Sequence, residues 1–130
     1  MTIFSKIING EIPSYKIAED DRFIAFLDVF PLKPGHTLVV PKTETDKWSA
    51  LTPDYLQHWL AFAQPIAKAM EQAFTCNRVG LAVIGLEVPH AHLHLVPINS
   101  ANDLNFTQEK IKMAQEELRE AQNKILRYLP

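Results

Sequence analysis

The sequence contains a single cysteine, Cys76, so neither an intramolecular disulfide nor a cysteine-based zinc site can be built from it alone. It has no basic excess, because 13 lysines and arginines face 15 aspartates and glutamates, for a net charge of −2. Broad electrostatic binding to nucleic acid or to an anionic membrane is therefore not favoured, although a local site for one small anion is still allowed.

Long hydrophobic runs are also missing. The first ten residues have neither the apolar core nor the small-residue cleavage site of a secretory signal, and no apolar stretch is long enough to span a bilayer. With its lone cysteine compatible with a reducing compartment, we expect a cytoplasmic protein without membrane contacts.

The 130 residues fit one domain, and 47 % hydrophobic and 22 % charged residues are ordinary for a globular chain. Alternating or β-branched segments bounded by turn residues predict strands at residues 14–19, 22–27, 36–40, 78–84 and 91–98. Thr52-Pro53 predicts a helix start, followed by apolar residues at helical spacing up to Phe74. Pro65 falls inside that pattern and should kink the helix or remove one hydrogen bond.

The sequence leaves alternatives for the structure of the two ends of the chain. Residues 2–10 predict either a short helix or an extended arm. From Thr107 onward, apolar residues at three-four spacing predict a second long helix, whose narrow stripe packs on the chain's own sheet or contributes to a dimer contact. The order of strands and helices indicates an α+β fold with an antiparallel sheet.

Three of the five histidines alternate in the run His90-Ala91-His92-Leu93-His94-Leu95-Val96. Because side chains alternate across a strand, the three imidazoles should share one face and the apolar residues the other. Imidazole is a nucleophile, a base and an acid near neutral pH, and a strand would hold neighbouring rings in fixed positions. One ring could attack while another donates a proton or contacts an anion, which suits covalent phosphoryl chemistry.

Structural and metal-binding roles are also possible for the histidines of this sequence. A lone histidine such as His58, beside Trp59, is typically structural. The His-x-His spacing also fits zinc, although the only evident companion ligands are Glu87 and His36. Three protonated rings so close together would repel one another.

The histidine run resembles the motif of the histidine triad (HIT) family, and is nearest to its nucleotide-binding (HINT-like) bacterial branch. Further stretches agree with the family in the same order, over about residues 2–98: Ile3-Phe4-Ser5-Lys6-Ile7-Ile8 with Glu11-Ile12-Pro13, Glu19-Asp20-Asp21 with Ala25-Phe26-Leu27-Asp28, and Pro31 with Gly35-His36-Thr37-Leu38-Val39-Val40-Pro41-Lys42. Residues after 100 are not diagnostic.

The resemblance implies a single domain over residues 1–130, with a five-stranded antiparallel sheet, two main helices and residues 101–130 as a C-terminal helical extension. It also implies a homodimer. The family binds purine nucleotides and cleaves at the α-phosphorus through a nucleotidyl-histidine intermediate. No metal and no cofactor are expected, and the N-terminal cysteines that hold zinc in some members have no counterpart here.

Site roles follow from the same resemblance. His92 is the expected nucleophile, His94 should contact the phosphate oxygens, and His90 should orient the site by hydrogen bonds, with His36 as its expected partner. His36 should also lie near the phosphate or the leaving group. The general acid is left unassigned.

Asp28 should accept hydrogen bonds from the ribose hydroxyls, unless it only caps the following turn. The base should lie against apolar side chains, each of which can equally serve the core: Ile3, Phe4, Ile7, Phe26 and Val29.

The segment before the histidines departs from the family pattern. The asparagine is absent, the glycine-rich loop is shorter, and the usual Gly-Gln-Ser/Thr stretch is Gly85-Leu86-Glu87. A carboxylate at Glu87 would repel a phosphate, so it either points away, orients a histidine or contacts a cationic leaving group.

Three hypotheses result. The first is a hydrolase for a nucleoside phosphoramidate, an acyl-nucleotide or a dinucleoside polyphosphate, with activity falling below roughly pH 6 as the nucleophile becomes protonated. The second is a nucleotide-binding module with little turnover, and the third is a metal-binding strand.

Overall fold

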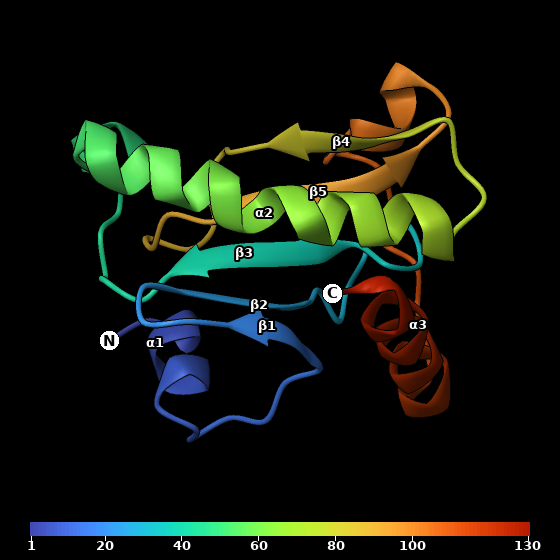
Figure 1. Ribbon diagram of the computed structural model, residues 1–130, viewed down its shortest axis with the longest axis horizontal. Helices are drawn as coiled ribbons and strands as arrows, with labels where there is room; N and C mark the ends of the chain where they lie inside the picture. Colours follow the sequence, from blue (N-terminus) through green and yellow to red (C-terminus); the bar gives the residue numbers. More distant parts are fainter.

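The computed structural model describes residues 1–130 and contains a five-stranded antiparallel sheet in the order β1-β2-β3-β5-β4 (Figure 1). This confirms the predicted fold class. The strands are β1 (Lys16–Glu19), β2 (Phe23–Leu27), β3 (Thr37–Pro41), β4 (Arg78–Ala82) and β5 (Leu93–Ile98). Four of the predicted strands were longer, and the one at 36–40 is shifted by one residue. The consequential difference is in β5, which starts at Leu93 rather than at residue 91.

The helices are α1 (Ile3–Ile8), α2 (Pro53–Ala73) and α3 (Gln115–Tyr128), with short 3₁₀ turns at Trp48–Ala50 and Ala101–Leu104. At the N-terminus the short helix is the correct alternative, and the Thr2 hydroxyl caps it by accepting from the Ser5 N–H. The predicted start of α2 is confirmed, because Thr52 caps it in the same way. The helix continues through Pro65.

The two faces of the sheet bury different clusters because neighbouring strand residues point to opposite sides. Phe23, Ala25 and Leu27 join α2 in a core of 16 buried residues. Ile24, Phe26 and the β3 residues Leu38 and Val40 join Phe4 of α1 in a smaller cluster on the opposite face. Figure 1 shows α2 lying across the first of these faces. His94 follows Leu93 in β5 and therefore points to the α1 face, which is where the site forms.

The C-terminal helix starts later than predicted. Residues 107–114 are irregular, and α3 begins only after Ala114, whose N–H donates to Glu117 Oε1. The Ile111 N–H donates to the Pro31 carbonyl at 3.0 Å, which commits this stretch to a tertiary contact. Leu118, Ala121 and Ile125 are buried in the main core, so the apolar stripe packs on the chain's own fold. None of the helices combines the length and apolarity that crossing a bilayer requires.

Gly35 sets the path of the chain into β3. Its φ of +92° lies in the region that favours glycine, and a Cβ added there would lie 2.6 Å from Phe74 Cζ. His36 follows directly, so the glycine fixes how this histidine enters the site.

We expect Gly35→Ala to lower the free energy of unfolding by about 1–3 kcal/mol, because backbone strain adds to a collision with the Phe74 ring. Gly10→Ala is the matched control, since Gly10 has a similar φ of +81° but nothing within 4 Å of the added Cβ. Urea denaturation of both variants measures the difference. Equal losses would show that the Phe74 contact is unimportant.

Candidate active site

The four histidines of the predicted site come from two places in the fold. His94 lies in β5 and His36 directly precedes β3, while His90 and His92 lie in the loop before β5. The expectation of three histidines on one strand is therefore wrong, because the strand starts only at Leu93. The apolar side of the motif behaves as predicted, with Ala91, Leu93 and Leu95 in the main core.

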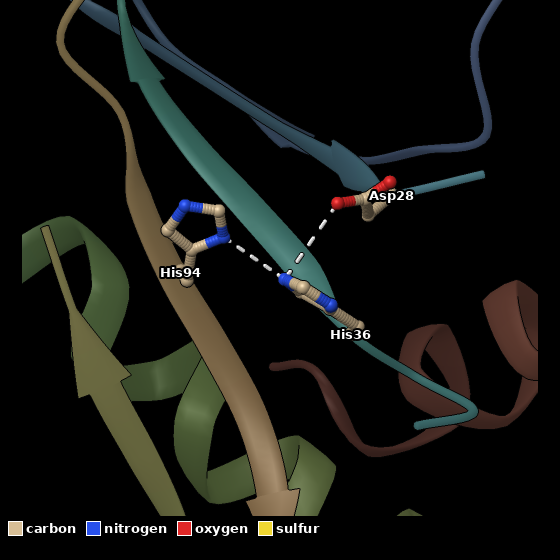
Figure 2. A group of neighbouring side chains, drawn as sticks. All are labelled: Asp28, His36 and His94. Carbon is tan, nitrogen blue, oxygen red and sulfur yellow. Dashed lines mark hydrogen bonds and ion pairs between the residues drawn. The ribbon is translucent and has the colours of Figure 1, made fainter. Parts of the chain in front are cut away.

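Strand register explains why His36 meets His94. Leu38 pairs with His94, so His36, two residues earlier on the same face, is its diagonal neighbour. Asp28 follows the end of β2, where Leu27 pairs with Thr37, and its N–H donates to the His36 carbonyl at 2.9 Å. Figure 2 shows the three side chains converging from β2, β3 and β5.

A hydrogen-bond chain assigns the tautomers of His36 and His94. The Leu32 N–H donates to His36 Nδ1 at 3.0 Å, so the His36 proton is on Nε2. That Nε2 lies 3.0 Å from His94 Nδ1, which must accept (Figure 2). The His94 proton is consequently on Nε2, where it is a donor for an anion.

His92 is the opposite tautomer to His94, with its proton on the other ring nitrogen. Its Nδ1 lies 2.8 Å from the His90 carbonyl oxygen, which can only accept, so Nδ1 carries the proton. Nε2 is therefore left with a free electron pair. The Phe4 ring packs edge-on at 4.9 Å from the His92 ring, between centroids, and holds its orientation.

His90 is fully buried and is tied to the scaffold. Its Nε2 donates to the Pro41 carbonyl at 2.7 Å, and its Nδ1 accepts from the Thr2 hydroxyl at 2.8 Å. The predicted hydrogen bond between His90 and His36 is wrong, since His36 bonds to His94 instead. His90 reaches the site through its backbone carbonyl on His92. Thr2 was missed by the sequence analysis, although its capping chemistry could have identified it.

Burial favours the neutral form of His36, His92 and His94 near pH 7. Desolvation lowers the pKa of His36 to about 4 and that of His94 to about 3. Desolvation also lowers the pKa of His92, partly offset by its bond to the His90 carbonyl. The repulsion expected between protonated rings is thus avoided at neutral pH.

Asp28 caps the turn that follows it, while its expected bonds to the ribose hydroxyls stay a prediction. One carboxylate oxygen accepts from the Phe30 N–H at 2.9 Å, which caps the turn, and the other lies 3.7 Å from His36 Nε2. Its side chain also lines the two pockets beside the histidines. Desolvation raises the pKa of this carboxyl to about 6, against the opposing effects of the Phe30 N–H and Lys110.

A pocket of about 260 Å³, here called the apolar pocket, lies between α1, β2 and the histidines. It includes every side chain predicted to contact the base: Ile3, Phe4, Ile7, Phe26 and Val29. Phe4 and Phe26 are buried and also belong to the smaller core cluster, so they serve both purposes.

A second pocket of about 230 Å³, here called the polar pocket, adjoins the first. The two share Asp28, Glu87, His92 and His94, so these four residues lie at their junction. Glu87 is exposed there. The polar pocket also contains residues that the sequence analysis missed, because it treated their segment as part of a helix: Phe106, Thr107 and Lys110.

Asp28, His36 and His94 are also a possible metal-binding group, since one ligand atom from each lies within 4.8 Å of the others. Two imidazoles and a carboxylate suit zinc. His36 Nε2 and His94 Nδ1 are hydrogen-bonded to each other, so a metal ion that uses either nitrogen must break that bond. Of the two companion ligands expected from the sequence, His36 is in this group and Glu87 is not, and Asp28 completes the group.

The raised pKa of Asp28 gives a pH-dependent prediction. Above about pH 6 the carboxyl is ionised in the folded and the unfolded state, and burial of the charge destabilises the fold. Below the ordinary pKa of 3.8 it is protonated in both states, and this destabilisation is absent. We expect Asp28→Asn to raise the free energy of unfolding by on the order of 2–3 kcal/mol at pH 7.5, with most of this gain lost at pH 4. Urea denaturation at both pH values measures it. Asp21→Asn, in an exposed turn, is the control. A gain that is the same at both pH values would contradict the assignment.

The fold agrees with those of known proteins. The family model of the HIT domain matches residues 9–101. The chain is 36 % identical to the adenosine 5'-monophosphoramidase HNT1 of Saccharomyces cerevisiae over 96 aligned residues. This alignment covers 73 % of this chain and 61 % of HNT1. The crystal structure of a Hit-like protein from Bartonella henselae is 34 % identical, with a TM-score of 0.84 over 98 % of this chain and 96 % of that one. A zinc-bound histidine triad family protein from Mycobacterium smegmatis is 30 % identical, with a TM-score of 0.78 over 96 % and 93 % of the two chains. The matched region spans most of the sequence and includes His36, His90, His92 and His94, and the chain therefore belongs to the HIT domain family.

Proposed function

We propose that this member of the HIT family, whose fold is a nucleotide-binding one, hydrolyses a purine nucleotide derivative at its α-phosphorus. The observation that carries the proposal is the state of His92. Its Nε2 has a free electron pair, because Nδ1 donates to the His90 carbonyl, and its ring lies where the apolar and polar pockets meet. A neutral imidazole in that place is suited to attack a phosphorus atom positioned between the pockets.

The pockets suggest how a nucleotide would be oriented. The base occupies the apolar pocket, and Asp28 accepts hydrogen bonds from the ribose hydroxyls. The α-phosphate then lies at the junction, where the His94 Nε2–H can donate to one of its oxygens. Glu87 is exposed at the same junction.

The reaction has two displacements at the same phosphorus. In the first, the His92 Nε2 electron pair forms a bond to phosphorus, and the bond to the leaving group breaks with its electron pair on that group. An amine leaving group takes up a proton from solvent in this step. The His90 carbonyl stabilises the positive ring through Nδ1–H. In the second, a water oxygen attacks, the P–N bond breaks with its pair returning to Nε2, and a water proton passes to solvent. The product is a nucleoside monophosphate.

The leaving group can belong to a phosphoramidate, an acyl-nucleotide or a dinucleoside polyphosphate. The phosphoramidase name of the yeast relative supports the first of these. A cytoplasmic location remains a prediction.

Replacing the nucleophile tests the proposal. We expect His92→Ala to lower AMP release from adenosine 5′-phosphoramidate by at least about 10³-fold, since the covalent route is lost. Burial lowers the pKa of His92, so the acid limb of the wild-type rate should lie below the ordinary histidine value of 6.5. His58→Ala, on the exposed side of α2, is the control. Equal rates for wild type and His92→Ala would reject the proposal.

The second candidate is a nucleotide-binding module with little turnover. Glu87 favours it, because an exposed carboxylate at the junction repels a phosphate. This alternative predicts AMP binding in calorimetry, together with release from the phosphoramidate that does not exceed that of His92→Ala.

We also propose a homodimer, as the family resemblance implies. β4 is an edge strand, and beside it a groove over α2 is lined by six apolar residues of seven, among which Leu60 and Leu81 are exposed. Exposed apolar patches on a sheet edge favour association with a second copy. Sedimentation equilibrium should give a dimer for the wild type and a monomer for Leu81→Glu. A wild-type monomer would reject the proposal.

A further inference from the structure

Residues 105–114 follow the region that the family model matches, yet they form part of the site. The Phe106 ring lies 4.6 Å from the His94 ring and 6.1 Å from the His36 ring, between centroids. The Ile111 N–H donates to the Pro31 carbonyl and fixes the segment against the loop that precedes His36. This stretch therefore has a defined position on one side of the histidines.

Lys110 is the charged residue that this segment brings to the polar pocket. Its Nζ donates to the Phe106 carbonyl at 2.8 Å and lies 6.0 Å from the Phe106 ring centroid, so a half-buried ammonium is held at the pocket wall. An ammonium has three donors, and one of them is used in this bond. Two remain for acceptors on a ligand.

The charge balance of the polar pocket depends on this lysine. Among the residues that line the pocket, Lys110 is the only lysine or arginine, while Asp28 and Glu87 are the carboxylates. Its charge acts on the catalytic side chains, because it lowers the pKa of His36 and His94 and opposes the rise in the pKa of Asp28. The histidines themselves bring no positive charge near pH 7.

The arrangement of the two pockets decides what Lys110 meets. With the nucleoside in the apolar pocket and the α-phosphorus at the junction, the group beyond the phosphorus extends into the polar pocket. We propose that Lys110 binds this leaving group and makes the site selective for leaving groups that carry phosphate charge, as in a dinucleoside polyphosphate, over amines. The inference rests on the proposed function and narrows its substrate class.

The chemistry of leaving-group release agrees with this selectivity. When His92 attacks, the bond from the α-phosphorus to the bridging oxygen breaks, and the electron pair stays on the oxygen of a leaving phosphate. That anion is stable without a proton, and the Lys110 ammonium offsets its new charge. An amine leaving group must instead take up a proton. Burial lowers the pKa of His36 and His94 to about 4 and about 3, so neither ring holds an extra proton to give.

The experiment compares two substrates that share the adenosine and the α-phosphorus. Diadenosine triphosphate releases ADP as its leaving group, and adenosine 5′-phosphoramidate releases ammonia. We expect Lys110→Met, which removes the charge but keeps the chain length, to lower the ratio of the two kcat/KM values about tenfold, the size of one charge-assisted hydrogen bond. Lys110→Arg should retain most of the ratio. Lys112→Met, on the exposed side of the same segment, should leave both substrates unchanged.

A binding measurement makes the test independent of turnover. In the His92→Ala background, Lys110→Met should weaken diadenosine triphosphate about tenfold more than AMP in calorimetry. Circular dichroism and thermal melts establish that each variant folds. Equal losses for both substrates would indicate a general loosening of the segment and would overturn the inference, as would an unchanged ratio.

The proposed function and the inference can fail separately. If the wild type hydrolyses neither substrate faster than His92→Ala, the hydrolase proposal fails, and the binding difference alone then decides whether Lys110 selects phosphate. If the wild type turns over either substrate but neither the ratio nor the binding difference responds to Lys110→Met, the hydrolase proposal stands and the role of Lys110 is lost.

Discussion

The hydrogen bond from His36 to His94 connects the backbone of one loop to the chemistry of a distant strand. It has a single direction, because the Leu32 N–H occupies His36 Nδ1 and forces the His36 proton onto Nε2. His94 must then accept at Nδ1 and present its own proton at Nε2. A backbone amide therefore determines which atom of His94 is offered to an anion. The bond is maintained near pH 7 because burial keeps both rings neutral.

The orientation of His92, the proposed nucleophile, depends on a second chain of hydrogen bonds. His90 is held between the Pro41 carbonyl and the Thr2 hydroxyl, and its own carbonyl then fixes the proton of His92. Thr2 is also the N-cap of α1, so the residue that starts this helix also positions the histidine loop. Phe4, two residues later, packs against His92 and lines the apolar pocket. In the proposed mode of binding, one short helix therefore couples the placement of the nucleoside to the orientation of His92.

The sequence predicted much of this and failed where backbone geometry decides the outcome. Helix caps, turn residues and alternation located the five strands and α2, and the histidine motif identified the site. Alternation also predicted that His90 and His92 lie within a strand, which is wrong. The His90 side chain is hydrogen-bonded to Pro41 and Thr2, and the strand pairing begins only after it. The helical spacing predicted a helix from Thr107, but the backbone of this stretch bonds to Pro31 and does not form a helix. No local pattern shows that Phe106 and Lys110 return to the histidines, since that contact is tertiary.

Glu87 and Lys110 together account for the unusual segment before the histidines. Leu86-Glu87 stands where the resemblance implies an uncharged Gln-Ser/Thr pair, and it puts a carboxylate beside the proposed position of the phosphate. Lys110, from outside the matched region, reaches the same pocket, and the two charges act on Asp28 in opposite directions. A negative group in the polar pocket would therefore meet one cation, Lys110, as well as the carboxylates of Asp28 and Glu87. An uncharged leaving group without acceptor atoms would leave the free donors of Lys110 unused. The departure from the family pattern is thus consistent with a change in which leaving group is bound, with the histidine chemistry unchanged.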